Sequence, residues 1–326
     1  MRKRITILVL ALFIMGACLV QPLSAAAVYP TKPIEVIVPF TAGGTNDLMA
    51  RLVAEVSKKY LGQPMVIINK PGAGGTIGVA ETVKAPADGY KLVSVPSNYF
   101  STTVYTQKIP FEPTDLVPIA NFMAYRNGLI VKGNAPYKTL NDLLDYGKKN
   151  PGKIRWAHMN RGSALFMQTY LVFKKAGVQA VDVPYPGLPD CLNAVLGGHV
   201  DAAPISFGGS REHTKAGNVR YLAVYRDQRF PEFPNVPTAK ELGFVEATKF
   251  TTLLGFYAHK NVPEDVKKTL FEAFKKTFDD PAFKKAFDAF GEDDVFTGPE
   301  KVTAHIKEEA SFTVPLLKEW GLYQGK

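Results

Sequence analysis

Two glycine-rich segments near the start of the chain carry the residue types best suited to binding an anion. Each stands between a predicted strand and a predicted helix, so the free N–H groups at the start of that helix point outward. Such amides bind an anion without a charged side chain. The pair therefore predicts a site that grips one carboxylate, directly or through ordered water. The candidate residues are Phe40, Thr41, Ala42, Gly43, Gly44, Thr45, Asn46 and Asp47 in the first segment, and Gly72, Ala73, Gly74, Gly75 and Thr76 in the second.

Phosphate is the competing anion for these two loops. Neither loop ends in the Lys-Ser/Thr pair of a P-loop. The spacing of Gly72, Gly74 and Gly78 loosely matches a dinucleotide fingerprint, but Ile77 stands where that fingerprint requires glycine. The alternative interpretation is that both loops are tight turns whose glycines supply positive φ angles. Two such loops in succession favour a functional site.

Further candidate ligand contacts follow later predicted strands or precede later predicted helices. They are Ser97, Asn98, Asn160, Arg161, Gly162, Ser163, Tyr185 and Asp201. Two interpretations of Arg161 stay open, since it either holds a distal carboxylate bidentately or is a solvated surface residue. Asp47 and Asp201 either serve local structure, with Asp47 at the start of a helix, or accept a hydrogen bond from a ligand.

Three aromatic residues also stand near these positions. Tyr99, Phe100 and Phe166 form either an aromatic wall of the site, which would favour an aromatic or longer apolar acid over citrate, or ordinary core packing.

Strand and helix patterns alternate along the chain, which predicts an α/β fold with mixed, mostly parallel sheets. Apolar runs at 128–131 and 253–258 look like crossings between two lobes and are the expected hinge. We expect a first lobe of residues 28–130 plus 253–326 and a second lobe of residues 131–252. The predicted strands are 34–40, 65–68, 91–95, 154–157, 181–184, 202–206 and 219–224, and the predicted helices are 46–61, 76–84, 139–149, 163–176 and 190–196, with three more beginning at Pro263, Pro281 and Pro299.

The N-terminus has the pattern of an export signal. Three basic residues precede a short apolar stretch and an Ala25-x-Ala27 cleavage site, which predicts a signal peptide at 1–27. A transmembrane anchor is not expected, because it would need about 20 apolar residues and this stretch is shorter. Lipidation at Cys18 is an alternative. Cleavage after Ala27 leaves Cys191 as the one cysteine, so no intramolecular disulfide is expected.

The charge balance gives weaker information about partners. The chain has 326 residues, 39 basic and 30 acidic, for a net charge of +9. Loss of the three basic residues in 1–27 leaves 36 basic against 30 acidic residues, or +6. The basic residues are scattered among acidic ones, so nucleic-acid binding is not expected. The five histidines show no metal-ligand spacing and no Gly-x-Ser-x-Gly motif occurs, so we expect no metal site and no catalytic residues.

Several motifs together resemble one family. They are Val38-Pro39-Phe40-Thr41-Ala42-Gly43-Gly44, Asn69-Lys70-Pro71-Gly72-Ala73-Gly74-Gly75, Asp88-Gly89-Tyr90, Val183-Pro184-Tyr185, Leu196-Gly197-Gly198 and Val236-Pro237-Thr238. Over essentially the whole mature chain, this pattern is similar to that of the tripartite tricarboxylate transporter substrate-binding receptors, the Bug family. The chain departs from the family at Asn160, where Gly is common, at Phe166, where His is common, and at Pro186, where Lys is common.

The resemblance implies a two-lobed periplasmic-binding-protein fold of type II. It implies a monomeric periplasmic receptor without a cofactor, which closes over a di-, tricarboxylate or aromatic acid and delivers it to a two-component membrane permease. A secreted enzyme that acts on a carboxylate in the same cleft is the alternative.

Overall fold

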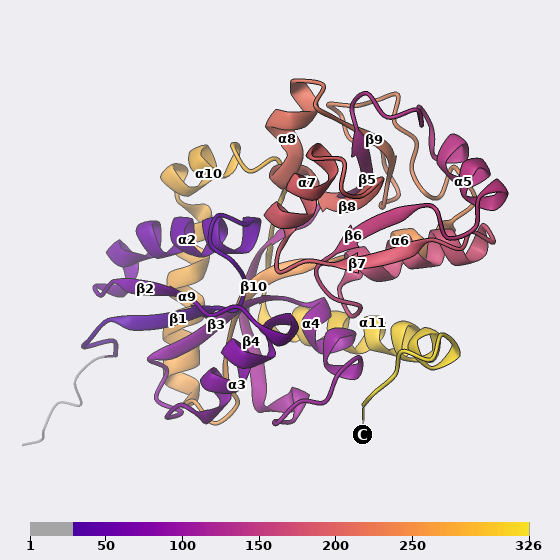
Figure 1. Ribbon diagram of the computed structural model, residues 1–326. Coiled ribbons are helices and arrows are strands. Elements are labelled where there is room, and N and C mark those ends of the chain that lie inside the picture. The colour runs from indigo at the N-terminus through magenta and orange to yellow at the C-terminus, as the bar shows by residue number, and fades with distance from the viewer. Residues whose placement is uncertain (1–28, 326) are drawn as a thin grey trace, which may run out of the picture.

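The computed structural model describes residues 29–325. The predicted signal peptide and Cys18 lie outside the described residues. Between residues 29 and 325, no helix combines the length and the apolar character that crossing a membrane requires. Two sheets, each flanked by helices, form two lobes (Figure 1).

The first sheet has the strand order β11-β4-β10-β3-β1-β2. Its strands are β1 (Ile34–Val38), β2 (Met65–Asn69), β3 (Lys91–Pro96), β4 (Leu116–Ala124), β10 (Leu253–His259) and β11 (Asp293–Thr297). Its helices are α2 (Thr45–Leu61), α3 (Thr76–Lys84), α4 (Asn98–Ser101), α9 (Glu264–Asp279), α10 (Pro281–Phe287) and α11 (Pro299–Glu319). Strand β1 reads as a nearly unbroken apolar run because helices cover both faces of the sheet.

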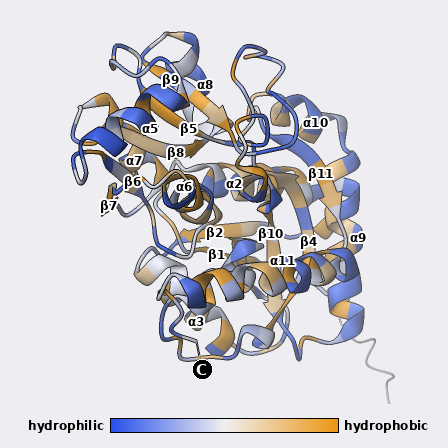
Figure 2. Cartoon of the chain, turned by 90° about the vertical axis from the view of Figure 1, so that its right-hand side faces the viewer, coloured by the Kyte–Doolittle hydropathy of each residue, from blue (hydrophilic) through white to orange (hydrophobic). Residues whose placement is uncertain are grey.

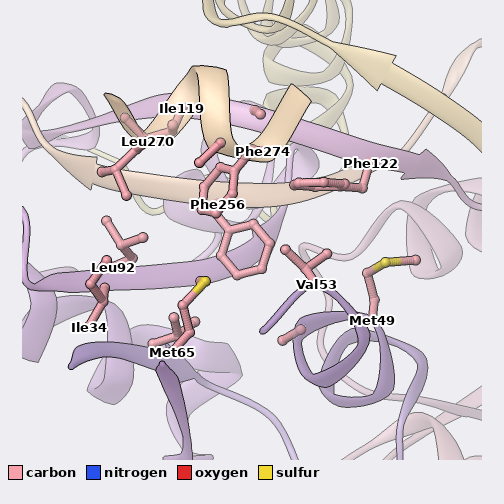
Figure 3. Packing of buried hydrophobic residues seen from close by; sticks show 14 of the residues in the cluster. Ile34, Met49, Val53, Met65, Leu92, Ile119, Phe122, Phe256, Leu270 and Phe274 are labelled. Carbon is pink, nitrogen blue, oxygen red and sulfur yellow. The ribbon is translucent and has the colours of Figure 1, made fainter. Parts of the chain in front are cut away.

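Helices α2 and α9 pack on this sheet through a shared apolar cluster (Figure 3). Phe122 on β4 meets Phe256 on β10 and Phe274 on α9 in edge-to-face contacts, with ring centroids 5.7 and 5.6 Å apart. Met49 and Val53 of α2 belong to the same cluster. Full burial of each such side chain contributes about 1.5–3 kcal/mol, so this core holds the start of α2 in place at the edge of the cleft.

The second sheet has the strand order β7-β6-β8-β5-β9. Its strands are β5 (Asn127–Lys132), β6 (Arg155–His158), β7 (Val181–Pro184), β8 (Ala202–Ser206) and β9 (Val219–Val224), and its helices are α5 (Leu140–Lys149), α6 (Ala164–Lys175), α7 (Leu188–Leu196) and α8 (Phe207–Lys215). Figure 2 shows apolar colour along the strands of both sheets and polar colour on the outer turns of α5 and α9.

The mixed character of the sheets is confirmed, but parallel pairs do not predominate. Among the described strands, four pairings are parallel and five are antiparallel. The expectation of mostly parallel sheets is wrong because β5, β10 and β11 all pair antiparallel with their neighbours.

The chain changes sheets just before each of the two predicted crossing segments. The first change falls at Tyr125 and Arg126, between β4 and β5, and the second falls before β10. The segments 128–131 and 253–258 are therefore strands within the two sheets and not the connections themselves. Helix α11 is a further link, since Val302 packs in the first lobe and Leu317 in the core of the second. The division at residues 130 and 253 stays a prediction.

Candidate functional site

A cavity of about 60 Å³ lies where the two lobes meet. Loops at the starts of helices contribute most of its wall. Its lining residues are Phe40, Thr41, Gly44, Thr45, Asn46, Gly74, Pro96, Asn98, Tyr99, Thr103, Tyr125, Asn127, Met159, Asn160, Ser163, Ala164, Leu165, Gly187, Leu188, Pro189 and Thr252. The two glycine loops are thus brought together with one edge of the second lobe.

The N-terminus of α2 forms one wall of this cavity. Gly44 is the N-cap, in extended conformation, and no side chain caps the helix. Neither Thr45 nor Asn46 caps the helix, because both side chains have other partners. Thr45 Oγ1 lies 3.4 Å from Ser206 Oγ, and Asn46 Nδ2 donates to the carbonyl of Ser94 at 3.0 Å. The first-turn N–H groups therefore remain available to an anion.

Asp47 does not line the cavity but joins the two glycine loops. Its carboxylate accepts the N–H of Gly43 at 2.9 Å, Nδ2 of Asn69 at 2.9 Å and Nε of Arg51 at 3.1 Å. Burial opposes ionisation, but the bonds from Arg51, Gly43 and Asn69 outweigh it and lower the pKa of Asp47. Asp47 is a structural carboxylate, as the local interpretation expected, although it anchors the loop and does not cap the helix.

The second glycine loop reaches the cavity through Gly74. Gly72, Ala73 and Gly75 instead border a side groove of about 390 Å³, which also shares Phe40 and Gly74 with the cavity. Other lining residues of this groove are Pro39, Thr41, Pro71, Met159, Asn160, Tyr185 and Pro186. Tyr185 thus lies at the groove and not in the cavity.

The aromatic candidates separate into one wall residue and two core residues. Tyr99 lines the cavity, its hydroxyl lies 3.1 Å from Thr76 Oγ1, and burial raises its pKa to about 12. Phe100 packs against Tyr257 in the first lobe, with ring centroids 4.7 Å apart. Phe166 packs in the second lobe, 5.2 Å from Trp156. Thr76 itself is buried behind Tyr99.

The second lobe touches the first through the loop before α6. Asn160 and Ser163 line the cavity, and Ser163 is the N-cap of α6, where its Oγ accepts the N–H of Phe166 at 3.1 Å. The carbonyl of Gly162 accepts Nδ2 of Asn98 at 3.3 Å and Oγ1 of Thr103 at 2.9 Å. These two bonds cross between the lobes and hold them closed.

Several predicted site residues lie elsewhere. Arg161 is exposed and donates from Nε to Asp182 at 2.9 Å, so it is not directed at the cavity. Asp201 accepts the N–H of Arg155 at 2.8 Å and serves local structure. Ser97 is buried and its Oγ accepts the N–H of Leu253 at 3.1 Å. Ala42 and Gly43 are exposed outside the cavity.

Sequence reasoning missed the residues at the lobe crossings. Tyr125, Asn127 and Thr252 line the cavity, yet nothing in the local sequence marks them. Leu188 and Pro189 had a signal, because the Gly187-Leu-Pro segment begins α7. No group of three or more metal-ligating side chains occurs within residues 29–325.

Comparisons with known proteins decide the family. A family model described as tripartite tricarboxylate transporter family receptor matches residues 49–322. Protein BugT of Bordetella pertussis is 32% identical over 317 residues, which cover 96% of each chain. The chain belongs to this receptor family. A UPF0065 protein of Cupriavidus necator is 31% identical over 297 residues, 90% of this chain and 89% of the relative.

Three solved structures have the same fold. The periplasmic binding protein BugD superimposes with a TM-score of 0.84 at 28% identity, over 90% of this chain and 99% of BugD. Rpa4515 of R. palustris, solved with adipate, superimposes with a TM-score of 0.83 at 26% identity, over 90% of this chain and 98% of Rpa4515. MatC of Rhodopseudomonas palustris, solved with malate, superimposes with a TM-score of 0.81 at 25% identity, over 87% of this chain and 98% of MatC. The two-lobed periplasmic-binding-protein fold is thereby confirmed.

Proposed function

We infer that this protein is a periplasmic solute-binding receptor that captures a small carboxylate between its lobes. The observation that carries the proposal is the N-terminus of α2, whose first-turn amides face the interlobe cavity without a side-chain cap. A helix N-terminus favours negative charge. The adipate and malate bound by two structural relatives support a carboxylate as the ligand.

Capture is expected to involve closure of the lobes and no covalent chemistry. The bonds from Asn98 and Thr103 to Gly162 form only when the lobes meet. The closed form would then deliver its ligand to a two-component membrane permease, as family membership suggests. The predicted signal peptide at 1–27 supports a periplasmic location.

A thermal-unfolding panel with the chain from residue 28 onward tests the proposal. The ligands are mono-, di-, tri- and aromatic carboxylic acids, each paired with its primary amide as a control. An acid at 100 times its dissociation constant should add about 2.7 kcal/mol to the free energy of unfolding, while its amide should not. The proposal fails if no acid stabilises the protein. NMR of the incubated acids gives a second readout, since turnover would support an enzyme instead.

A further inference from the structure

The cavity offers an anion no charged partner. Within residues 29–325, none of its lining residues is Lys, Arg, His, Asp or Glu. Basic side chains close to it in the sequence are already engaged: Arg51 pairs with Asp47, and Arg161 pairs with Asp182. The helix amides can balance one carboxylate. A second one would be buried without a partner, which is costly.

A longer ligand would meet the same difficulty in the side groove. That groove continues from the cavity past Phe40 and Gly74 toward Tyr185 and Pro186. Its lining residues in the described part of the chain are also uncharged. A distal carboxylate that extends into this groove therefore finds no cation, which disfavours diacids and triacids that reach past Phe40 and Gly74.

One buried acceptor in the cavity wall lacks a hydrogen-bond donor. Asn127 is 3% exposed, and its Nδ2 donates to Oε1 of Gln168 at 3.3 Å. The orientation of Gln168 is fixed, because its own Nε2 donates to the carbonyls of Tyr225 and Phe250 at 3.4 and 3.2 Å. The remaining atom of Asn127, Oδ1, is buried without a partner in the described structure. Since Asn127 lines the cavity, a bound ligand is the natural source of a donor.

The position of Asn127 requires the ligand's donor group to lie close to the ligand's carboxylate. Asn127 on β5 pairs directly with Ser206 on β8, so their side chains share one face of the sheet. Ser206 Oγ in turn lies 3.4 Å from Thr45 Oγ1, at the first residue of α2. The unpartnered acceptor therefore stands beside the N-terminus where the carboxylate is expected. Two further unpartnered hydroxyls, of Thr41 and Thr252, line the same cavity.

We propose that the ligand is a monocarboxylate with an uncharged hydroxyl group near its carboxyl group and an otherwise apolar body. The carboxylate contacts the amides of α2, and the hydroxyl donates to Asn127 Oδ1. The body packs against Tyr99, Leu165 and Leu188, which line the cavity. An ammonium group would satisfy Asn127 as a donor, but it would bury a second charge without a counter-ion. This proposal rests on the proposed function and specifies its ligand.

Four matched four-carbon acids test the proposal by calorimetric titration: butanoate, 2-hydroxybutanoate (both enantiomers), succinate and malate. They separate the effect of the hydroxyl group from that of the second carboxylate. We expect one enantiomer of 2-hydroxybutanoate to bind about tenfold more tightly than butanoate, as one added hydrogen bond allows. Succinate and malate should each bind at least tenfold more weakly than their monoacid counterparts.

The outcomes distinguish this proposal from the function on which it rests. If a diacid binds as tightly as its monoacid counterpart, or if the hydroxyl group gives no gain, the proposal is overturned while a carboxylate receptor stands. Absence of binding by every acid here and in the thermal panel would overturn both. Tighter binding of 2-aminobutanoate than of 2-hydroxybutanoate would overturn the proposal that the ligand's donor to Asn127 is uncharged.

Two variants test the role of Asn127. Asn127→Ala should bind butanoate and 2-hydroxybutanoate equally well. Asn121→Ala is the matched control, because Asn121 is also buried in a sheet but does not line the cavity; it should keep the hydroxyl preference. If Asn127→Ala does not fold, the wild-type comparison of the four acids still decides the proposal. Retention of the full preference in a folded Asn127→Ala variant would contradict the assignment.

Discussion

Replacement of Gly162 by alanine should prevent closure without damage to either lobe. A Cβ atom built on Gly162 lies 2.5 Å from the backbone Cα of Thr103 and 2.5 Å from Oγ1 of Thr106. Both partners belong to the opposite lobe, and one of them is backbone, so a side-chain rotation cannot relieve the overlap. The φ angle of Gly162 lies outside the left-handed region, so alanine fits its own loop.

The size of the effect follows from these contacts. The Gly162 carbonyl would lose its bonds from Asn98 and Thr103, each worth about 0.5–1.5 kcal/mol. Overpacking of a tight contact costs typically about 1–3 kcal/mol. A combined penalty of about 2–6 kcal/mol on the closed form corresponds to a dissociation constant raised roughly 30- to 20,000-fold.

Isothermal titration calorimetry with the acid that best stabilises the wild-type protein measures this effect. The matched control is Gly209→Ala in α8, where a new Cβ meets only ordinary contacts, the shortest 3.5 Å from Ser206 Oγ. The melting temperature without ligand should stay close to the wild-type value for both variants. If Gly162→Ala binds within twofold of wild type, the closed contact does not hold the ligand and the reasoning is refuted.

Three further predictions concern residues outside the cavity. Burial raises the pKa of Glu309 from 4.5 to about 7, so its protonated form favours the folded state and this contribution is lost as pH rises through about 7. In urea unfolding, the free energy of unfolding of Glu309→Gln should therefore rise by on the order of 3 kcal/mol relative to that of the wild type when the pH is raised from 4.5 to 8. A difference between the two proteins that does not change with pH would count against this. Because Arg161 pairs with Asp182, Arg161→Ala should change calorimetric affinities for monoacids and diacids by less than twofold, and a selective loss for diacids would restore Arg161 to the site. Burial raises the pKa of the Cys191 thiol to about 12, so iodoacetamide at pH 8 should modify it only in denaturant, as mass spectrometry would show; rapid modification of the folded protein would contradict that burial.

Local patterns in the sequence predicted most of the elements. Helix α3 and strand β8 have the predicted bounds, because each carries its periodicity and its end signals within a few residues. Strand β4 was missed, since full burial removes the alternation of apolar and polar residues and Pro118 interrupts its pattern. The predominance of parallel pairs was wrong because pairing is set by the path of the whole chain.

The candidate site also has a part that local sequence predicts and a part that only the fold assembles. The uncapped amides at the start of α2 were predictable from the loop itself, as its glycines precede a helix. Arg161 was ambiguous because its partner, Asp182, follows 21 residues later and only the fold brings the two together. Asn127 and Thr252 enter the cavity from two crossings far apart in the chain. No local pattern marks such residues.

The central claim is that backbone amides of α2 bind the carboxylate, and one pair of variants at Thr45 tests it directly. Thr45→Pro removes the first N–H of the helix. Proline is tolerated at this position, and the φ and ψ of Gly44, −75° and 162°, suit a residue before proline. Thr45→Val keeps the N–H and loses only the hydroxyl group. Calorimetric titration with the best-binding acid should show an affinity at least tenfold lower for Thr45→Pro than for Thr45→Val, as expected for a hydrogen bond to a charged group. Equal affinities in the two folded variants would contradict the account.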